Sequence, residues 1–193
     1  AGVPIPEAMT GRSLLPVLRS DQAGWIDPRR DHVIFGKERH VPAQKYPSME
    51  GYPCRGIRTA RYLYIWNIDP QRWPAGVPED STRGVPYADC DNGPTKAFIL
   101  EHRDDPQYAK HYELCFAKWP GEELYDVQAD PDQLHNLADD PSYALIKERL
   151  ATQLKQELKA TGDPRVIGGG EKFKTYPYYG RMRTLPTEVE KES

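Results

Sequence analysis

The sequence predicts an α+β domain in which an antiparallel sheet of about four strands is packed by one long helix near the C-terminus. Three observations support this fold class. Residues 55–69 alternate in the manner of a β-hairpin, and short strand-like runs lie on both sides of that hairpin. Residues 141–164 carry an apolar stripe with helical spacing. No internal repeat is visible.

Composition and net charge limit the classes of protein to which the chain can belong. The chain has 193 residues, of which 38% are hydrophobic, which is enough for one domain with a real core. Its 19 prolines predict much loop. The net charge of −3 argues against nucleic-acid partners, which require a basic surface. No run of 18 apolar residues is present, so no membrane span is expected.

The N-terminal stretch AGVPIPEAMTG has neither the basic region nor the apolar region of a signal peptide. We interpret it as an internal start, with part of a parent protein missing. Ser13 is the expected N-cap of a short helix over residues 14–18. Residues 32–35 form an apolar run bounded by a glycine and predict a buried strand.

The hairpin follows a loop at residues 41–54. Ile57 and Thr59 alternate with Arg58, and a tight turn is expected near residues 60–61. The second strand is bulky on both faces, which predicts a central strand. Residues 68–93 form a long proline-rich loop, and a loop of this length in a domain usually carries function or is disordered.

Three helices are expected after this loop. Pro94 favours the first turn of one, and a second short helix follows Pro106. The third is the long one, with Asp140 as its N-cap and Gly162 at its left-handed C′ position. Its apolar stripe consists of Ile146, Leu150, Leu154 and Leu158.

The acidic run EELYDVQADPDQLHNLADDP, residues 122–141, resembles a metal loop at first sight. It lacks the glycine and the closing glutamate of an EF-hand, so we interpret it as scaffold. A strand leads into a turn at residues 130–131, Asn136 bonds to the backbone, and Leu134 and Leu137 anchor the loop. The three cysteines form no C-x-x-C pair, which excludes a zinc ribbon.

Four motifs occur in a characteristic order: GRSLLPVL, FGKERH, RGIRTARYLYI and EELYDVQADPDQLHNLA. Together they resemble the C-terminal part of type I sulfatases, in particular the N-sulfoglucosamine sulfohydrolase (heparan N-sulfatase) group, over roughly residues 8–165. The family pattern D-P-x-E has Gln133 in place of its glutamate, so any ionic role of that glutamate is absent here.

This resemblance implies a place in a larger enzyme. A missing N-terminal domain of alkaline-phosphatase-like α/β fold would carry the active site, and the present chain would be the C-terminal subdomain. Residues 1–30 would connect the two, residues 31–165 would form the subdomain, and residues 166–193 would be an irregular tail. The parent would be periplasmic, secreted or lysosomal.

Family catalysis implies a formylglycine, made from the Cys or Ser of a C/S-x-P/A-x-R motif, and a Ca²⁺ ion. None of Cys54, Cys90 and Cys115 lies in such a motif. We therefore assign neither a catalytic residue nor a metal ligand to this chain, place both cofactors in the rest of the parent, and expect the chain alone to be inactive.

The candidate substrate-binding residues are Lys37, Arg39 and His40, which open a loop after the strand at residues 32–35. A sulfated sugar requires cationic and hydrogen-bonding groups, and His40 is the strongest candidate. The alternative is a solvated strand end. Lys96 is a further candidate, because a lysine in the first turn of a helix is unfavourable for the dipole unless an anion holds it; the alternative is an ordinary exposed lysine.

Arg55 and Arg58 flank a strand and could line an anion-binding cleft or pair with the acidic turn at residues 130–132. Trp73, in the long loop, could stack on a sugar ring. These features leave two alternatives to a sulfatase of sulfated glycans. One is a non-catalytic glycan-binding or interaction module, and the other is part of a related phosphate- or phosphonate-ester hydrolase.

Overall fold

A computed structural model describes residues 3–7 and 9–180. Its sheet has four antiparallel strands in the order β1-β2-β3-β4, which confirms the predicted α+β class and the inner position of β3. The strands are β1 (His32–Lys37), β2 (Cys54–Thr59), β3 (Tyr62–Asn67) and β4 (Glu122–Asp126). The helices are α1 (Leu15–Leu18), α2 (Pro94–Glu101), α3 (Ala109–Phe116), η1 (Pro141–Tyr143), α4 (Ala144–Ala160), α5 (Pro164–Ile167) and η2 (Gly170–Thr175).

The core lies between the sheet and α4, the predicted long helix. In the strand register, Ile34 is opposite Ile57, Ile57 opposite Tyr64, and Tyr64 opposite Leu124. These side chains therefore share one sheet face, because alternate residues of a strand point to the same side. Buried residues of α4 pack on that face: Leu150, Leu154 and Leu158. The predicted stripe is confirmed, with Ile146 partly buried beside it.

Strand β1 lies at the edge of the sheet, so the prediction of a buried strand is wrong. Val33 is 60% exposed and Phe35 is 40% exposed, while Ile34 between them packs toward the core. An edge strand is covered on one face only, and a short apolar run does not reveal this. The Phe35 ring fills the space above Gly56, where a Cβ atom would lie 2.2 Å from the ring Cζ.

The helix ends follow the predicted capping residues in part. Asp140 accepts a hydrogen bond from the N–H of Ser142 at 2.8 Å, although the first turn it caps is the 3₁₀ helix η1. Gly162 follows α4 with a φ of 74°. Ser13 is not the N-cap of α1: that position is Leu14, although the Ser13 hydroxyl accepts from the N–H of Leu15 at 3.2 Å.

The acidic run is built as scaffold in the structure. The Asn136 Oδ1 atom accepts from the N–H groups of Leu124 and Ala138, at 2.9 and 3.0 Å. Leu137 packs against the core, but Leu134 is 43% exposed and is not part of the core cluster, contrary to prediction. The loop after β4 is therefore held by side-chain hydrogen bonds of Asn136 and Asp130 to the backbone and by the packing of Leu137 and Ala138.

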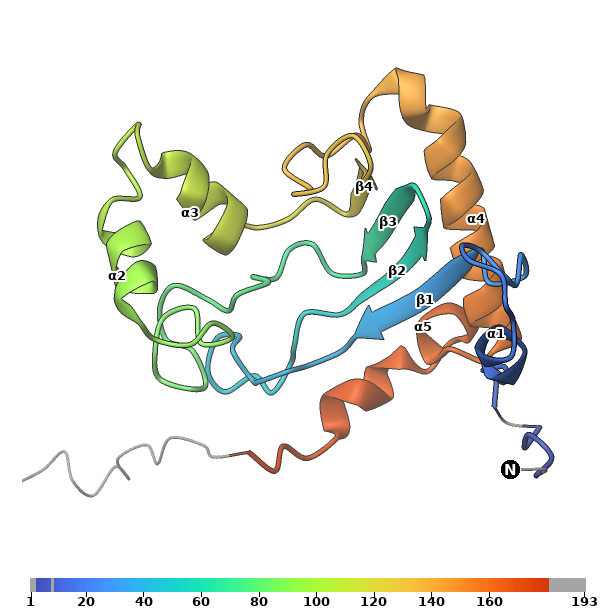
Figure 1. Cartoon of the computed structure of the whole chain (residues 1–193). Coiled ribbons are helices and arrows are strands. Elements are labelled where there is room, and N and C mark those ends of the chain that lie inside the picture. The colour runs from blue at the N-terminus through green and yellow to red at the C-terminus, as the bar shows by residue number, and fades with distance from the viewer. Residues whose placement is uncertain (1–2, 8, 181–193) are drawn as a thin grey trace, which may run out of the picture.

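A second lobe lies at the opposite end of the molecule from α4 (Figure 1). It contains the loops 41–53 and 68–93 together with α2 and α3. Its buried apolar residues are Val41, Ala43, Tyr52, Tyr87 and Phe116, and the ring centroids of Tyr87 and Phe116 lie 5.0 Å apart. Among the described residues, no helix is long and apolar enough to cross a membrane.

The segment after α4 contains two short helical pieces, α5 and η2, in a part of the chain predicted to be irregular from residue 166. Pro164 begins α5 instead of only ending the long helix. Residues 181–193 of the predicted tail lie outside the described residues. The division of the chain at residues 30 and 165 stays a prediction.

Candidate functional site

Two of the predicted substrate-binding residues meet at the seam between the sheet and the second lobe. The His40 Nδ1 atom lies 2.5 Å from Asp89 Oδ1, and the Lys37 Nζ atom lies 3.4 Å from Asp89 Oδ2. The Asp89 side chain is 10% exposed, whereas that of His40 is 71% exposed. A largely buried carboxylate thus orients one lysine and one histidine side chain that remain open to solvent.

This arrangement can bind a polar anionic ligand. With Nδ1 donating to Asp89, the Nε2 atom of His40 has no hydrogen-bond partner among the described residues. In the neutral ring Nε2 accepts from a hydroxyl group, and in the imidazolium it donates to an oxyanion. The ammonium of Lys37 lies on the same carboxylate, 39% exposed, and adds three donors and a charge.

Asp89 is the residue that the sequence prediction missed. It lies in the long loop 68–93, and the length of that loop was the only signal that pointed to it. No pattern around Asp89 distinguishes it from the other acidic residues of the loop, because its importance comes from a contact made across 49 residues of sequence.

Lys96 supports this loop from inside. It is 7% exposed, and its ammonium donates to three backbone carbonyl groups, those of Pro86, Tyr87 and Cys90, at 2.8 to 2.9 Å. The side-chain oxygen of Asn92 lies 3.1 Å away. The Lys96 bonds thus bracket residue 89 on both sides. The alternative that Lys96 is an ordinary exposed lysine is therefore wrong, because its ammonium group lies against the loop.

Tyr87 shows how firmly the loop is fixed. Its φ of 46° lies in the left-handed region, which is unusual for an aromatic residue. Such strain persists only where the surroundings over-determine the conformation. The Tyr87 hydroxyl lies 2.8 Å from that of Tyr112, its ring packs on Phe116, and its carbonyl binds Lys96.

Arg39 points away from His40. Its guanidinium donates to the backbone carbonyl of Met49 at 2.8 Å and to those of Tyr176 and Pro177 at 2.8 and 3.1 Å. The structure therefore brings Lys37 and His40 together and gives Arg39 to the C-terminal segment. Whether any of the four predicted residues touches substrate remains a prediction.

Arg55 is the centre of a buried ion network, not a partner of the turn at residues 130–132. It donates to Glu38 at 2.6 Å and to Asp163 at 2.6 Å, with 8% of its side chain exposed. Burial is the largest single influence on Asp163 and raises its pKa, but the hydrogen bonds from Arg55 and from the backbone of Arg165, together with the charges of both arginines, lower the pKa overall. Trp73 is half-buried against Tyr87, with Lys118 over its ring, so no free sugar platform is formed.

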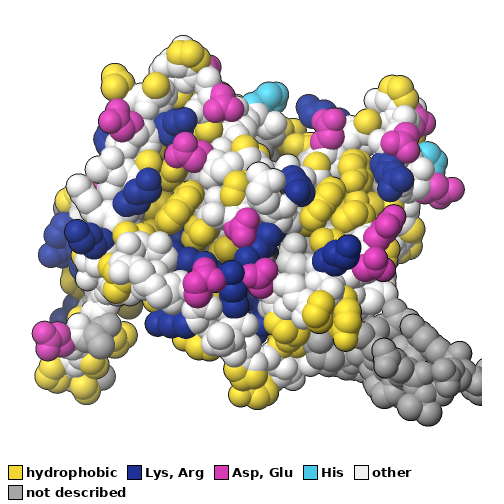
Figure 2. All heavy atoms as spheres, turned by 180° about the vertical axis from the view of Figure 1, so that it is seen from behind, with side chains coloured by type: hydrophobic (Ala, Val, Ile, Leu, Met, Phe, Trp, Pro, Cys, Tyr) yellow, Lys and Arg dark blue, Asp and Glu magenta, His cyan; other side chains and the backbone are white. Residues whose placement is uncertain are grey.

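The surface carries charges of both signs. Figure 2 shows acidic and basic side chains interspersed among apolar patches on the face that it presents. Within the described part of the chain, no three His, Cys, Asp or Glu side chains gather into a group that could hold a metal ion. The residues described here thus do not fit a calcium site.

Comparison with known proteins gives two informative relatives. The chain is 32% identical over 163 residues to an ulvan-active sulfatase of Formosa agariphila, covering 84% of this chain and 27% of that protein. It is 29% identical over 158 residues to human N-sulphoglucosamine sulphohydrolase, covering 82% of this chain and 28% of that protein. The chain thus spans just over a quarter of the length of these relatives. No family model matches the chain.

Solved structures give a weaker likeness. A 2-O GAG sulfatase aligns with a TM-score of 0.48 at 18% identity, covering 98% of this chain and 29% of that one. A protein solved with its substrate D-glucosamine-2-N,6-O-disulfate aligns with a TM-score of 0.45 at 21% identity, covering 85% and 23%.

The sheet, the closing helix and the two relatives together define the class of this chain as sulfatase-like. More particularly, it corresponds to the C-terminal part of a type I sulfatase, and the resemblance seen in the sequence is confirmed.

Proposed function

We propose that this chain is the C-terminal portion of an enzyme that hydrolyses sulfate esters or sulfamates of a glycan, and that Lys37 and His40 contact the substrate. The observation that carries the proposal is the pairing of both side chains on Asp89, in a chain similar to sulfatases over most of its length. Two exposed donors beside a sunken carboxylate suit a sugar that bears an anionic group and hydroxyls.

In this proposal Asp89 holds the His40 ring with its Nε2 atom outward, and Lys37 supplies a point charge for a sulfate oxygen. Lys96 keeps Asp89 in place through the loop that it binds. The formylglycine and the calcium ion, which would supply the nucleophile and polarise the sulfate, belong to the remainder of the parent enzyme. We further propose an extracytoplasmic location for that parent.

The test replaces His40 by Ala in the full-length protein that carries this chain. Loss of one hydrogen bond of about 1.4 kcal/mol raises KM about tenfold for a sulfated glucosamine substrate. His111→Ala is the matched control, because that histidine is exposed on α3 and lies outside the Asp89 contacts.

Unchanged kinetics for His40→Ala would refute the role of His40. If the full-length protein binds sulfated glucosamine without turnover, the chain is part of a glycan-binding module. Turnover of the phosphate analogue alone would favour the phosphoester alternative. Turnover by residues 1–193 by themselves would contradict the assignment of the nucleophile to another part of the parent.

A further inference from the structure

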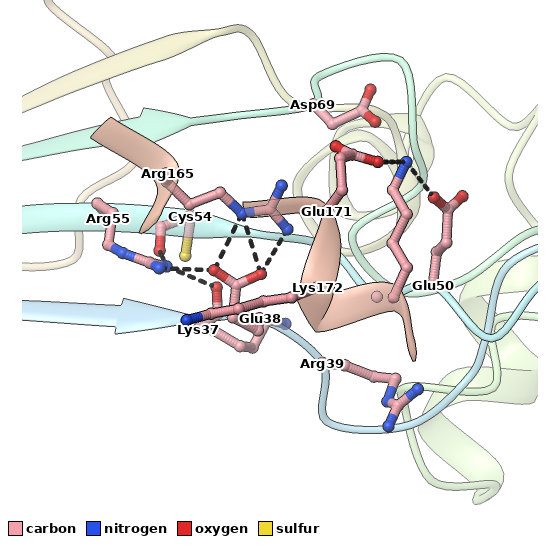
Figure 3. A network of polar contacts seen from close by, with 12 residues as sticks. Lys37, Glu38, Arg39, Glu50, Cys54, Arg55, Asp69, Arg165, Glu171 and Lys172 are labelled. Atoms are coloured by element: carbon pink, nitrogen blue, oxygen red, sulfur yellow. Dashed lines mark hydrogen bonds and ion pairs between the residues drawn. The ribbon is translucent and has the colours of Figure 1, made fainter. Parts of the chain in front are cut away.

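The loop that carries the candidate site shares its residues between two neighbours. Lys37 and His40 turn to Asp89, while Glu38 and Arg39, between them in sequence, turn to the segment after α4. Figure 3 shows the Glu38 carboxylate between the guanidinium groups of Arg55 and Arg165, with Arg39 directed elsewhere. Of these four consecutive residues, Lys37 and His40 therefore belong to the candidate site, and Glu38 and Arg39 attach the loop to the segment after α4.

The attachment is mostly buried and saturated with hydrogen bonds. Arg165 donates to Glu38 from Nε, at 3.2 Å to each carboxylate oxygen, and from Nη2 at 2.6 Å. Arg55 donates to the other side of Glu38 and also to the carbonyl of Lys37 at 3.3 Å. The Glu38 side chain is 22% exposed and that of Arg165 is 10% exposed. Bidentate arginine–carboxylate pairs fix direction as well as distance.

Two further contacts hold the C-terminal segment in place, one on Arg55 of β2 and the other on Arg39 of the loop. Asp163 begins α5 by accepting from the N–H of Arg165 at 2.8 Å, and its carboxylate accepts from Arg55. At the far end of the segment, the carbonyls of Tyr176 and Pro177 hold Arg39. The segment 163–177 thus grips the loop at residues 38 and 39, directly between the two side chains proposed to contact substrate.

We propose that segment 163–177 is a clasp that positions Lys37 and His40, with Glu38 and Arg165 as positioning residues. The effect of the clasp on substrate binding rests on the proposed function. The attachment of the loop is independent of that function. When the clasp is open, the strand end after Gly36 loses its fixed direction, and His40 and Lys37 no longer share Asp89.

The test compares Arg165→Gln with Lys172→Gln in the full-length protein. Lys172 lies in the same segment, is exposed, and makes no ion pair in the described contacts. Amide hydrogen exchange over residues 36–41 becomes about tenfold faster in Arg165→Gln, as expected for a locally opened loop, and stays unchanged in Lys172→Gln. The NMR signal of the His40 ring shifts in the first variant only.

Kinetics separate positioning from simple loss of folded enzyme. We expect KM to rise about three- to tenfold in Arg165→Gln with kcat within about twofold, because uniform binding is lost. A variant that only unfolds in part lowers the maximal rate and leaves KM unchanged. If Arg165→Gln does not fold, Arg165→Lys keeps the charge, loses the planar fork and serves in its place.

Unchanged exchange at residues 36–41 overturns the clasp. Faster exchange with unchanged KM overturns its role in positioning. If the wild-type protein turns over no sulfated sugar, the proposed function fails, and the exchange and ring-signal measurements still decide whether the clasp exists.

Discussion

The two ends of this molecule are held together in different ways. The sheet and α4 meet through a continuous apolar layer, in which Ile57, Leu124 and Leu154 are each 0% exposed. The second lobe buries apolar side chains outside that layer, namely Val41, Ala43, Tyr52, Tyr87 and Phe116, and is held in addition by polar groups that reach backbone atoms, such as Lys96 with three carbonyls. Apolar packing therefore dominates in one region, and polar contacts to backbone atoms shape the candidate site in the other.

The largest effect is expected in the apolar layer. Leu154→Ala removes a fully buried side chain from α4 and leaves a cavity, which destabilises by about 3 kcal/mol. Leu145→Ala, on the same helix but 81% exposed, is the control and should change the free energy of unfolding little. Urea unfolding measures both. Equal losses would contradict the role of the apolar layer under α4.

A smaller and more local effect is expected in the second lobe. Lys96→Met removes the ammonium donor from three backbone carbonyl groups, and we expect a loss of about 2 kcal/mol. The loss should be local: hydrogen exchange quickens at residues 86–92 while the amides of β2 and β3 keep their protection. The control is Lys110→Met on the exposed side of α3. Uniformly faster exchange would show that the lobes unfold as one unit.

The smallest effect concerns pH. His32 lies 2.7 Å from Asp31 and 2.6 Å from Glu157, and so ties the edge strand to α4. Burial is the largest single influence and lowers the pKa of His32, but the hydrogen bonds that its ring donates to the two carboxylates, together with their negative charges, raise it more, so the folded-state pKa lies above the ordinary value of 6.5. The resulting stability is full below that value and is lost as pH rises through the raised pKa.

Because Asp31 is 61% exposed, solvent screens this tie, and we expect about 0.5–1 kcal/mol. His32→Gln should flatten the decline in unfolding free energy above pH about 6.5, whereas His111→Gln should leave it as in the wild type. Identical pH profiles for wild type and His32→Gln would exclude the tie.

The sheet and α4 could be predicted from the sequence, because their apolar residues recur with the period of a strand or of a helix. The stripe on α4, the hairpin and the Asp140 cap follow from local spacing, and all are present. The edge position of β1 was missed, since strand order is a long-range property that a single run does not encode.

The second lobe and the site were less predictable for the same reason. The pairing of His40 with Asp89 and the cage around Lys96 are contacts between loops, set by folding and not by spacing. The candidate residues Lys37 and His40 could be named from their chemistry and their place after a strand, but their shared carboxylate could not.

Gly56 on β2 constrains which residue can stand opposite it on the edge strand β1. The Phe35 ring occupies the volume above it, so positions 35 and 56 form a pair in which a large side chain at one demands none at the other. A larger residue at position 56 alone would push the edge strand β1 outward. The displacement would reach Lys37 and His40, which follow Phe35 closely in the chain. Residue 56, which is not among the proposed substrate-binding residues, would then determine the direction of the Lys37 and His40 side chains. A smaller residue at position 35 would compensate for the change.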